Sequence, residues 1–208
     1  MLEMHPIIWI PLVLISFLCG SLPCSVWLGR LFLRLDVRQF GDGNPGATNV
    51  FRAGNRLLGL LALILDVSKA AAPVGVAYYN LGFRGLPMFL VAIAPILGHV
   101  FSPFLGFKGG KALSVALGVW IGLTIWKISL AAVVGVVFGL ALFTSPAWSV
   151  MMALGVILLV LVLWIPNPLL VWVWAGEMII LVWTHRAGLR LRPRLRGWLS
   201  KRLFKSGG

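Results

Sequence analysis

Long apolar runs separated by short cationic segments are the feature that most constrains this chain. Of its 208 residues, 60% are hydrophobic and only 11% are charged. A helix needs about 20 mostly apolar residues, within a range of about 17–25, to cross the hydrocarbon core of a bilayer. The sequence therefore predicts an all-α, polytopic integral membrane protein.

Apolar runs close to that length occur about seven times by this rule. The fourth and fifth are short, and only Lys127 separates them. A six-span alternative would merge these two runs and would put the basic C-terminal tail outside. We expect transmembrane helices at residues 6–29, 57–81, 85–106, 112–126, 128–143, 148–165 and 168–184.

The distribution of Lys and Arg predicts the orientation, because cytoplasmic loops carry an excess of both. With the N-terminus outside and the C-terminus cytoplasmic, only Arg84 and Lys127 fall outside, and Lys69 lies within a span. Two cytoplasmic loops (about 30–56 and 107–111) and the basic tail (185–208) then share one side of a single membrane domain, residues 1–208. The net charge of +13 lies between apolar runs, so no nucleic-acid partner is expected.

The first cytoplasmic loop combines glycines, amides and arginines. Glycine allows backbone N–H groups to surround an anion, and a guanidinium group suits a phosphate dianion. The alternative is an ordinary turn whose arginines only follow the positive-inside rule, and no Gly-Lys-Ser/Thr sequence makes it a P-loop. The candidate phosphate-binding residues are Gly41, Gly43, Asn44, Gly46, Thr48, Asn49 and Arg52.

The second cytoplasmic loop places two lysines around a Gly-Gly turn. Lys108, Gly109, Gly110 and Lys111 form a candidate cationic nest for phosphate. His99, at the predicted inner end of a span, is a candidate general base or hydrogen-bond donor. The alternative for His99 is a helix-end histidine that caps backbone carbonyls.

Four further polar residues lie at or within the predicted spans. His185 ends the last span, before arginines that we expect to bind anionic headgroups. Asp66 and Lys69, three residues apart, are expected to neutralise each other on one helix face. Glu177 stands alone near the middle of its span and must be protonated, paired or turned towards a polar cavity.

Metal, disulfide and covalent hydrolase chemistry are not indicated. Cys19 and Cys24 would point to different faces of one helix, so we expect neither a disulfide nor a metal pair. No histidine is followed four residues later by aspartate, and neither HExxH nor a serine-hydrolase elbow occurs. We therefore expect no metal and no serine nucleophile.

The motifs, in their order along the chain, resemble those of one family. They are Gly20-Ser21-Leu22-Pro23, the loop from Gly41 to Arg52, Gly98-His99 with Phe107-Lys108-Gly109-Gly110-Lys111, and His185-Arg186. They are similar to the cytoplasmic motifs of the PlsY family, the acyl-phosphate-dependent glycerol-3-phosphate acyltransferases of bacteria. The Asp66–Lys69 pair also resembles a feature of that family.

This resemblance implies seven spans in a bacterial inner membrane, with the active site facing the cytoplasm. It implies transfer of a fatty acyl group from acyl phosphate to the 1-hydroxyl of glycerol 3-phosphate, without a cofactor. Lysophosphatidate and inorganic phosphate would be the products. The expected partners are these two substrates and the lipid bilayer, and a monomer is one assembly consistent with the sequence.

The resemblance also implies roles for particular residues and marks two departures. The candidate catalytic residues are His99, Asp42, Lys111 and His185, and Arg186 joins the phosphate-binding set. Asp42 stands where the family usually has an active-site serine, and Gly188 where it usually has asparagine. The extra carboxylate should weaken phosphate binding unless it is turned away or paired with an arginine, or it could act as a base for the hydroxyl. Alternatives are a divergent paralogue of reduced activity and a transporter or flippase for a phosphorylated solute.

Overall fold

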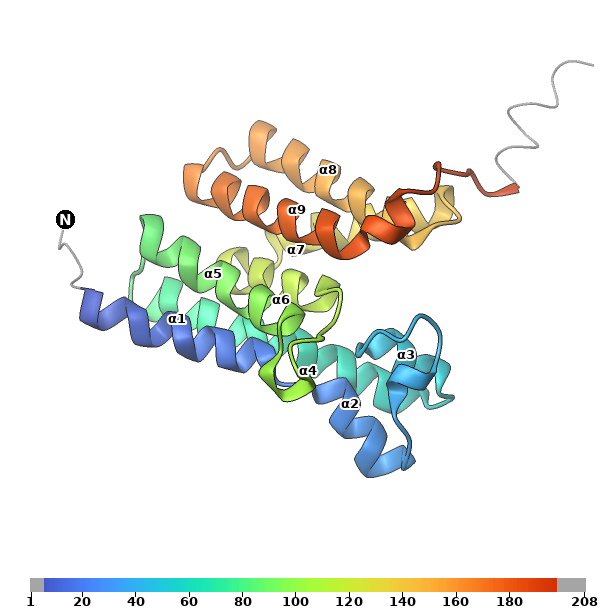
Figure 1. The fold of residues 1–208 in the computed structure, drawn as a ribbon. Coiled ribbons are helices and arrows are strands. Elements are labelled where there is room, and N and C mark those ends of the chain that lie inside the picture. The colour runs from blue at the N-terminus through green and yellow to red at the C-terminus, as the bar shows by residue number, and fades with distance from the viewer. Residues whose placement is uncertain (1–5, 198–208) are drawn as a thin grey trace, which may run out of the picture. The chain divides into compact units, whose positions relative to one another are not determined.

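The computed structural model describes residues 6–197, which are helical and contain no β-strand (Figure 1). The chain divides into two compact units, residues 1–125 and 126–208. The first unit contains α1 (Pro6–Ser21), α2 (Cys24–Leu28), η1 (Gly29–Leu33), η2 (Val37–Gln39), α3 (Ala47–Arg52), α4 (Arg56–Gly75), η3 (Val76–Asn80), α5 (Gly85–Val100), η4 (Pro103–Leu105) and α6 (Leu113–Thr124). The second contains α7 (Lys127–Leu142), α8 (Pro146–Leu163) and α9 (Pro168–Leu189).

Five helical segments are long and apolar enough to cross a membrane, and they match the first three and last two predicted runs. The other two apolar helices, α6 and α7, have 12 and 16 residues. At 1.5 Å per residue they are about 18 and 24 Å long, against about 30 Å of hydrocarbon. Seven crossings therefore stay a prediction. The five segments are Trp9–Leu33, Arg56–Asn80, Gly85–Leu105, Pro146–Leu163 and Pro168–Leu189.

The predicted division between the fourth and fifth runs is confirmed. Helix α6 ends at Thr124 and α7 begins at Lys127. Between them Ile125 has a φ of 59°, which lies outside the right-handed helical region. The helix therefore cannot continue through this residue, and the two apolar runs are separate helices.

Helices α1 and α5 pack against each other through small residues. A Cβ atom on Gly20 would collide with the backbone of Pro95, and one on Gly98 with the carbonyl of Phe17. Helices in a membrane associate through such close backbone contacts, because lipid gives no hydrophobic driving force between them. In the same unit, α4 packs against α6.

The first apolar segment is broken where α1 ends. Pro23 has no N–H and cannot continue the hydrogen-bond ladder, and α2 restarts at Cys24. The break leaves carbonyl groups for other partners: Ser102 Oγ donates to the Ser21 carbonyl at 2.6 Å, and Lys69 Nζ to the Leu22 carbonyl at 2.7 Å. These bonds tie the end of α1 to α4 and to the segment after α5.

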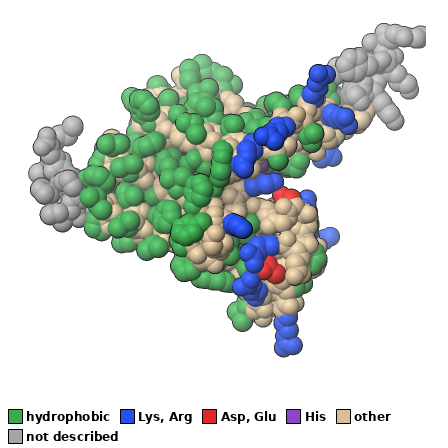
Figure 2. Space-filling model, viewed as in Figure 1, with side chains coloured by type: hydrophobic (Ala, Val, Ile, Leu, Met, Phe, Trp, Pro, Cys, Tyr) green, Lys and Arg blue, Asp and Glu red, His purple; other side chains and the backbone are tan. Residues whose placement is uncertain are grey.

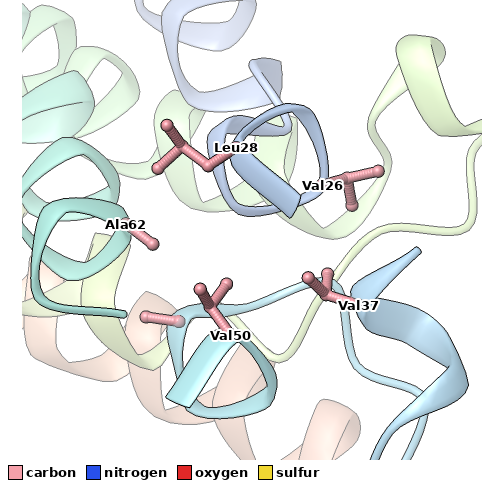
Figure 3. Packing of buried hydrophobic residues seen from close by; sticks show 6 residues of the cluster. Val26, Leu28, Val37, Val50 and Ala62 are labelled. Atoms are coloured by element: carbon pink, nitrogen blue, oxygen red, sulfur yellow. The ribbon is translucent and has the colours of Figure 1, made fainter. Parts of the chain in front are cut away.

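A small apolar core packs against the first loop, at about residues 30–56. Its side chains come from α2, η2, α3 and α4 and point towards one another (Figure 3). Burying one such aliphatic side chain is worth about 1.5–3 kcal/mol, so the cluster anchors both ends of the loop. Its members are Val26, Leu28, Val37, Ala47, Val50 and Ala62.

In the second unit, α7 packs against α8 and α8 against α9. Gly135 and Gly139 lie where an added Cβ atom would meet the backbone of Ala153 and Ser149 on α8. Trp174 Nε1 on α9 donates to a carbonyl of α8 at 2.9 Å. The unit is thus held by small-residue packing and by an indole hydrogen bond.

Candidate active site

The first loop, at about residues 30–56, begins with a cluster of charged residues. Asp36 accepts hydrogen bonds from Arg38 Nη2 at 2.7 Å and from Arg30 Nη2 at 3.0 Å. The Arg38 bonds hold the pKa of the Asp36 carboxyl well below its usual range, despite partial burial. Arg38 is therefore engaged within the loop, and it fixes the 3₁₀ turn η2 that leads into the glycines.

Two asparagines shape the middle of this loop. Asn49 Nδ2 donates to Asp42 Oδ1 at 3.1 Å and to the Asn44 carbonyl at 2.9 Å, and Arg52 Nη1 donates to Asn49 Oδ1 at 3.2 Å. Gly41 has a φ of 59°, and a Cβ atom there would collide with the Arg52 guanidinium. Asn49 is thus a buried connector that orients the exposed Arg52 towards the glycine turn.

The second loop, at residues 107–111, folds back onto the end of α5. The N–H groups of Gly109 and Gly110 donate to the carbonyls of Val100 and His99, at 3.0 and 3.1 Å. A Cβ atom on Gly109 would collide with the His99 carbonyl, and one on Gly110 with His99 Nε2. The Gly-Gly sequence is required because the loop lies directly against His99.

The structure brings the two loops together, as predicted, through Lys111. Its backbone N–H donates to Asn44 Oδ1 at 2.9 Å, and its Nζ donates to Asp42 Oδ2 at 2.7 Å. These two side chains lie far from Lys111 in sequence but belong to the glycine turn of the first loop. Asp42 and Asn44 of the first loop and Lys111 of the second therefore connect the two loops, and we call this contact the joint.

Asp42 is held as a carboxylate at this joint. Partial burial raises the pKa of Asp42, but hydrogen bonds from Lys111, from the Asn44 backbone and from Asn49 lower it by more, to about 2. The carboxylate is thus paired, although with a lysine and not with the arginine that the sequence analysis considered. An ammonium, an amide and a backbone N–H already hold one anionic group between the loops.

His99 lies behind this joint in a buried polar network. Lys69 Nζ is 3.0 Å from His99 Nδ1 and 2.7 Å from Asp66 Oδ1. Asp66 Oδ2 accepts from Ser25 Oγ at 3.0 Å. The predicted Asp66–Lys69 pair is confirmed, and Lys69 also contacts a candidate catalytic residue.

The contact between Lys69 and His99 was not predicted from the sequence. Lys69 was expected only to neutralise Asp66 within one helix, and that ion pair is one of its three hydrogen-bonding contacts. The signal was present, since an ionisable residue inside a span is a functional candidate by default. Ser25 and the Leu22 carbonyl carried no such signal, because their partners lie on other helices.

Three exposed residues complete the loops of the first unit. Thr48, Arg52 and Lys108 present their side chains to the surface. In Figure 2, Lys and Arg side chains with acidic side chains among them gather over the α2 and α3 end of this unit, whereas hydrophobic side chains cover α1. Gly43 and Gly46 lie in the same turn, where the Gly46 N–H donates to the Asn44 carbonyl at 2.8 Å.

His185 and Arg186 lie on α9, in the second unit. His185 is buried, and its Nδ1 is 2.9 Å from the Leu181 carbonyl. Arg186 is exposed, lies over the Trp183 ring at 4.6 Å and donates to the Trp183 carbonyl at 2.8 Å. A carbonyl can only accept, so Nδ1 of His185 is the donor in this contact.

Two further residues singled out in the sequence, Gly188 and Glu177, lie in the second unit. A Cβ atom on Gly188 would lie 2.8 Å from Ala147 Cβ, so α9 approaches the start of α8 too closely for a larger side chain. Glu177 is buried, with 2% of its surface exposed. In the first unit, Cys19 and Cys24 are both free thiols, but they lie on α1 and α2 and not on one helix as predicted.

Comparison with known proteins points to one family throughout. A family model for glycerol-3-phosphate acyltransferases matches residues 10–192. A glycerol-3-phosphate acyltransferase of Anaeromyxobacter dehalogenans is 46% identical over 141 residues, which cover 64% of this chain and 69% of the relative. One of Aromatoleum aromaticum is 39% identical over 183 residues, which cover 86% of this chain and 90% of the relative.

Solved structures show the same fold. A crystal structure of PlsY (YgiH), an integral membrane glycerol 3-phosphate acyltransferase in its glycerol 3-phosphate form, superposes with a TM-score of 0.80. It is 26% identical, and the match covers 94% of this chain and 98% of that one. The lysophosphatidic acid form of the same protein gives a TM-score of 0.78.

Proposed function

The chain belongs to the glycerol-3-phosphate acyltransferase (PlsY) family, and from this we propose that it transfers a fatty acyl group from acyl phosphate to glycerol 3-phosphate. Its membership of this family makes it a membrane acyltransferase of phospholipid biosynthesis. The acceptor is the 1-hydroxyl, and the products are lysophosphatidate and inorganic phosphate. The observation that carries the proposal is the joint at Lys111, where both loops already hold a carboxylate between them.

The loops are suited to phosphate because their donors are of the types that bind it. Lys111, Lys108 and Arg52 supply charge, and the Asn44 amide and the Thr48 hydroxyl supply directed hydrogen bonds. Asn49 and the N–H groups of Gly43, Gly46, Gly109 and Gly110, which the sequence predicted as phosphate donors, instead donate within the chain and shape the loops. The pairing of Asp42 with Lys111 supports this proposal, since Lys111 already holds one anionic group. We assign Arg52 and the first loop to one phosphate, and Lys108 and Lys111 to the departing or second phosphate.

Acyl phosphate is already activated, so the reaction needs positioning and charge stabilisation and no covalent enzyme intermediate. The hydroxyl oxygen of glycerol 3-phosphate forms a bond to the acyl carbon. The bond from that carbon to the phosphate oxygen breaks, and phosphate leaves with the electron pair. The hydroxyl proton passes to a base, and no cofactor is required.

The two histidines suit different parts of this reaction. His99 is assigned to donate a hydrogen bond to phosphate. His185, with Arg186 beside it in sequence, is proposed to complete the site. Asp42, with a pKa of about 2, is a weak base near neutral pH, so we assign it to holding Lys111.

We place the enzyme in the bacterial inner membrane with seven spans, the N-terminus outside and the loops facing the cytoplasm. The excess of Lys and Arg in the two loops supports this orientation. The apolar α6 and α7 would be short crossings in this arrangement. A monomer suffices, since both loops come from one chain.

A donor comparison tests this function. Purified full-length protein is given glycerol 3-phosphate with acyl phosphate, with an acyl-coenzyme A or with an acyl carrier protein thioester. We expect lysophosphatidate from acyl phosphate alone. Product from a thioester would contradict the assigned donor, and proteoliposomes that take up glycerol 3-phosphate without consuming any donor would indicate a transporter.

A further inference from the structure

We propose that Lys69 is a positioning residue that fixes His99 as the tautomer with a proton on Nε2, so that the ring presents a donor to the joint between the loops. This inference rests on the proposed function for its catalytic consequence. Its structural part, the tautomer, can be measured independently. The Asp66–Lys69 pair would then be part of the phosphate site and not only a neutralised pair within one helix.

The first step concerns the ammonium group of Lys69. It has three N–H donors and no acceptor. Three acceptors surround it: the Leu22 carbonyl at 2.7 Å, Asp66 Oδ1 at 2.7 Å and His99 Nδ1 at 3.0 Å. Each N–H has one acceptor, so Nδ1 of His99 must contribute its lone pair.

The second step concerns the environment that keeps this assignment in place. Asp66 and Ser25 are 1% and 0% exposed, and the second Asp66 oxygen accepts from Ser25. Both carboxylate oxygens are therefore occupied by donors. An unpaired charge buried at this depth would be costly, so Asp66 and Lys69 stay paired and Lys69 stays a donor to His99.

The third step concerns the opposite side of the imidazole ring. If Nδ1 accepts, the neutral ring carries its proton on Nε2. A Cβ atom built on Gly110 would collide with Nε2 and would lie 3.2 Å from Asn44 Oδ1. In the described part of the chain Nε2 makes no hydrogen bond, so its proton faces the joint and remains for a ligand.

The tautomer decides whether His99 attracts or repels phosphate. With the proton on Nε2, the ring donates to an anion in the joint. With the proton on Nδ1, a lone pair would face that anion. Removing one well-placed donor of this kind costs about 10²–10³ in rate, so the expected effect is measurable.

The competing interpretation is purely structural. In that case Lys69 only ties α4 to the Leu22 carbonyl at the break after α1. Ser102 makes a similar buried tie, from its Oγ to the neighbouring Ser21 carbonyl at 2.6 Å, without contacting Lys69. Ser102→Ala is therefore a matched control for loss of a buried hydrogen bond at this break.

The test uses full-length protein with ¹⁵N-labelled histidine, in which two-bond ¹H–¹⁵N correlations distinguish the tautomers. His99→Gln identifies the His99 signals. We expect His99 to carry its proton on Nε2 in the wild type and in Ser102→Ala. In the double variant Asp66→Asn/Lys69→Met, which leaves no unpaired buried charge, His99 should become a mixture of tautomers.

Kinetics complete the test. The double variant should lower kcat about 10²-fold, and Ser102→Ala should change it far less. Glutamine retains an N–H donor near the Nε2 position, so in the His99→Gln background the double variant should cost much less than in the wild type. Equal losses in both backgrounds would show that Lys69 acts independently of His99 and would overturn the proposal.

The outcomes separate this inference from the proposed function. A wild-type His99 with its proton on Nδ1 overturns the inference, whether or not the protein makes lysophosphatidate and even if the double variant does not fold. A wild type with the Nε2 proton but without acyltransferase activity contradicts the proposed function and leaves the tautomer assignment standing. A changed tautomer with unchanged kcat overturns the positioning role.

Discussion

Asp42 is an acidic residue of the candidate phosphate site, at a position where the resemblance to the family implies a serine. Its carboxylate contacts Lys111 Nζ at 2.7 Å, and both side chains are about two-fifths exposed (44% and 42%). A phosphate that uses Lys111 has to displace or share this contact. The aspartate therefore acts as an internal competitor for the anion site while it also links the loops.

Asp42→Ser should lower the KM for glycerol 3-phosphate. An exposed ion pair is worth about 0.2–1 kcal/mol, which corresponds to a fall of up to about fivefold. Steady-state kinetics at a fixed acyl phosphate concentration measure the KM for glycerol 3-phosphate. Asp36→Ser is the matched control, since Asp36 bonds to Arg38 and Arg30 and not to Lys111, and it should not lower the KM. A large loss of activity in Asp42→Ser would instead make the carboxylate a working part of the site.

The ionisation of Asp42 predicts a pH dependence. Its folded-state pKa of about 2 lies below the ordinary value of about 3.9, so its ion pair is fully present above about pH 4 and is lost as the pH falls through 2. Between pH 5 and 8, plots of log(kcat/KM) for wild type and Asp42→Ser should be parallel. A titration step seen only in the wild type would show that Asp42 ionises in catalysis.

The residue types of the site could be predicted from sequence, but their partners could not. Glycine next to lysine and arginine indicates an anion site wherever the loop lies, so the loops were identified from local sequence alone. The contact between Asp42 and Lys111, and that between Lys69 and His99, depend on how separate helices pack. Sequence spacing carries no information about such contacts.

At the scale of elements, the Gly-Gly turn is fixed by the end of α5. Gly110→Ala should reduce kcat/KM about 10²-fold, because its methyl group would collide with His99 Nε2 and displace either the ring or the loop. Gly155→Ala on α8 is the control, since an added Cβ there meets nothing within 4 Å. Activity assays of both purified variants measure this loss of kcat/KM. Equal activity of the two variants would contradict the close contact between Gly110 and the His99 ring.

Helices were predicted better than their interruptions. All seven apolar runs contain helices, because apolar length is a strong local signal. The first run, predicted as one helix over 6–29, is instead α1, α2 and η1, with a break at Pro23. Its sequence holds the proline, but proline is tolerated in membrane helices, so the break depends on tertiary partners such as Lys69 and Ser102.

At the scale of the whole molecule, the number of crossings depends on α6 and α7. Seven spans place the turn between them, at Trp126, outside the cell, and the turn between α7 and α8, at Ser145, inside. If α6 and α7 do not cross, both turns lie inside. The length of these helices alone does not distinguish the two arrangements.

Cysteine labelling distinguishes them. In a background with Cys19 and Cys24 replaced by alanine, we expect a membrane-impermeant maleimide to label Trp126→Cys in intact cells. Ser145→Cys, the matched control in the next turn, should react only in inverted vesicles. Labelling of both positions only from the inside would contradict seven spans and would favour five.

Direct acyl transfer at the joined loops is the central claim, and the stoichiometry of products tests it most directly. Purified protein, shown to be folded, receives acyl phosphate and glycerol 3-phosphate, and lysophosphatidate and inorganic phosphate are quantified in the same sample. We predict equal molar amounts, and a fall of both by about 10–100-fold in Arg52→Ala, as expected for loss of a charged hydrogen bond. Phosphate release without lysophosphatidate, or undiminished transfer in Arg52→Ala, would contradict the account.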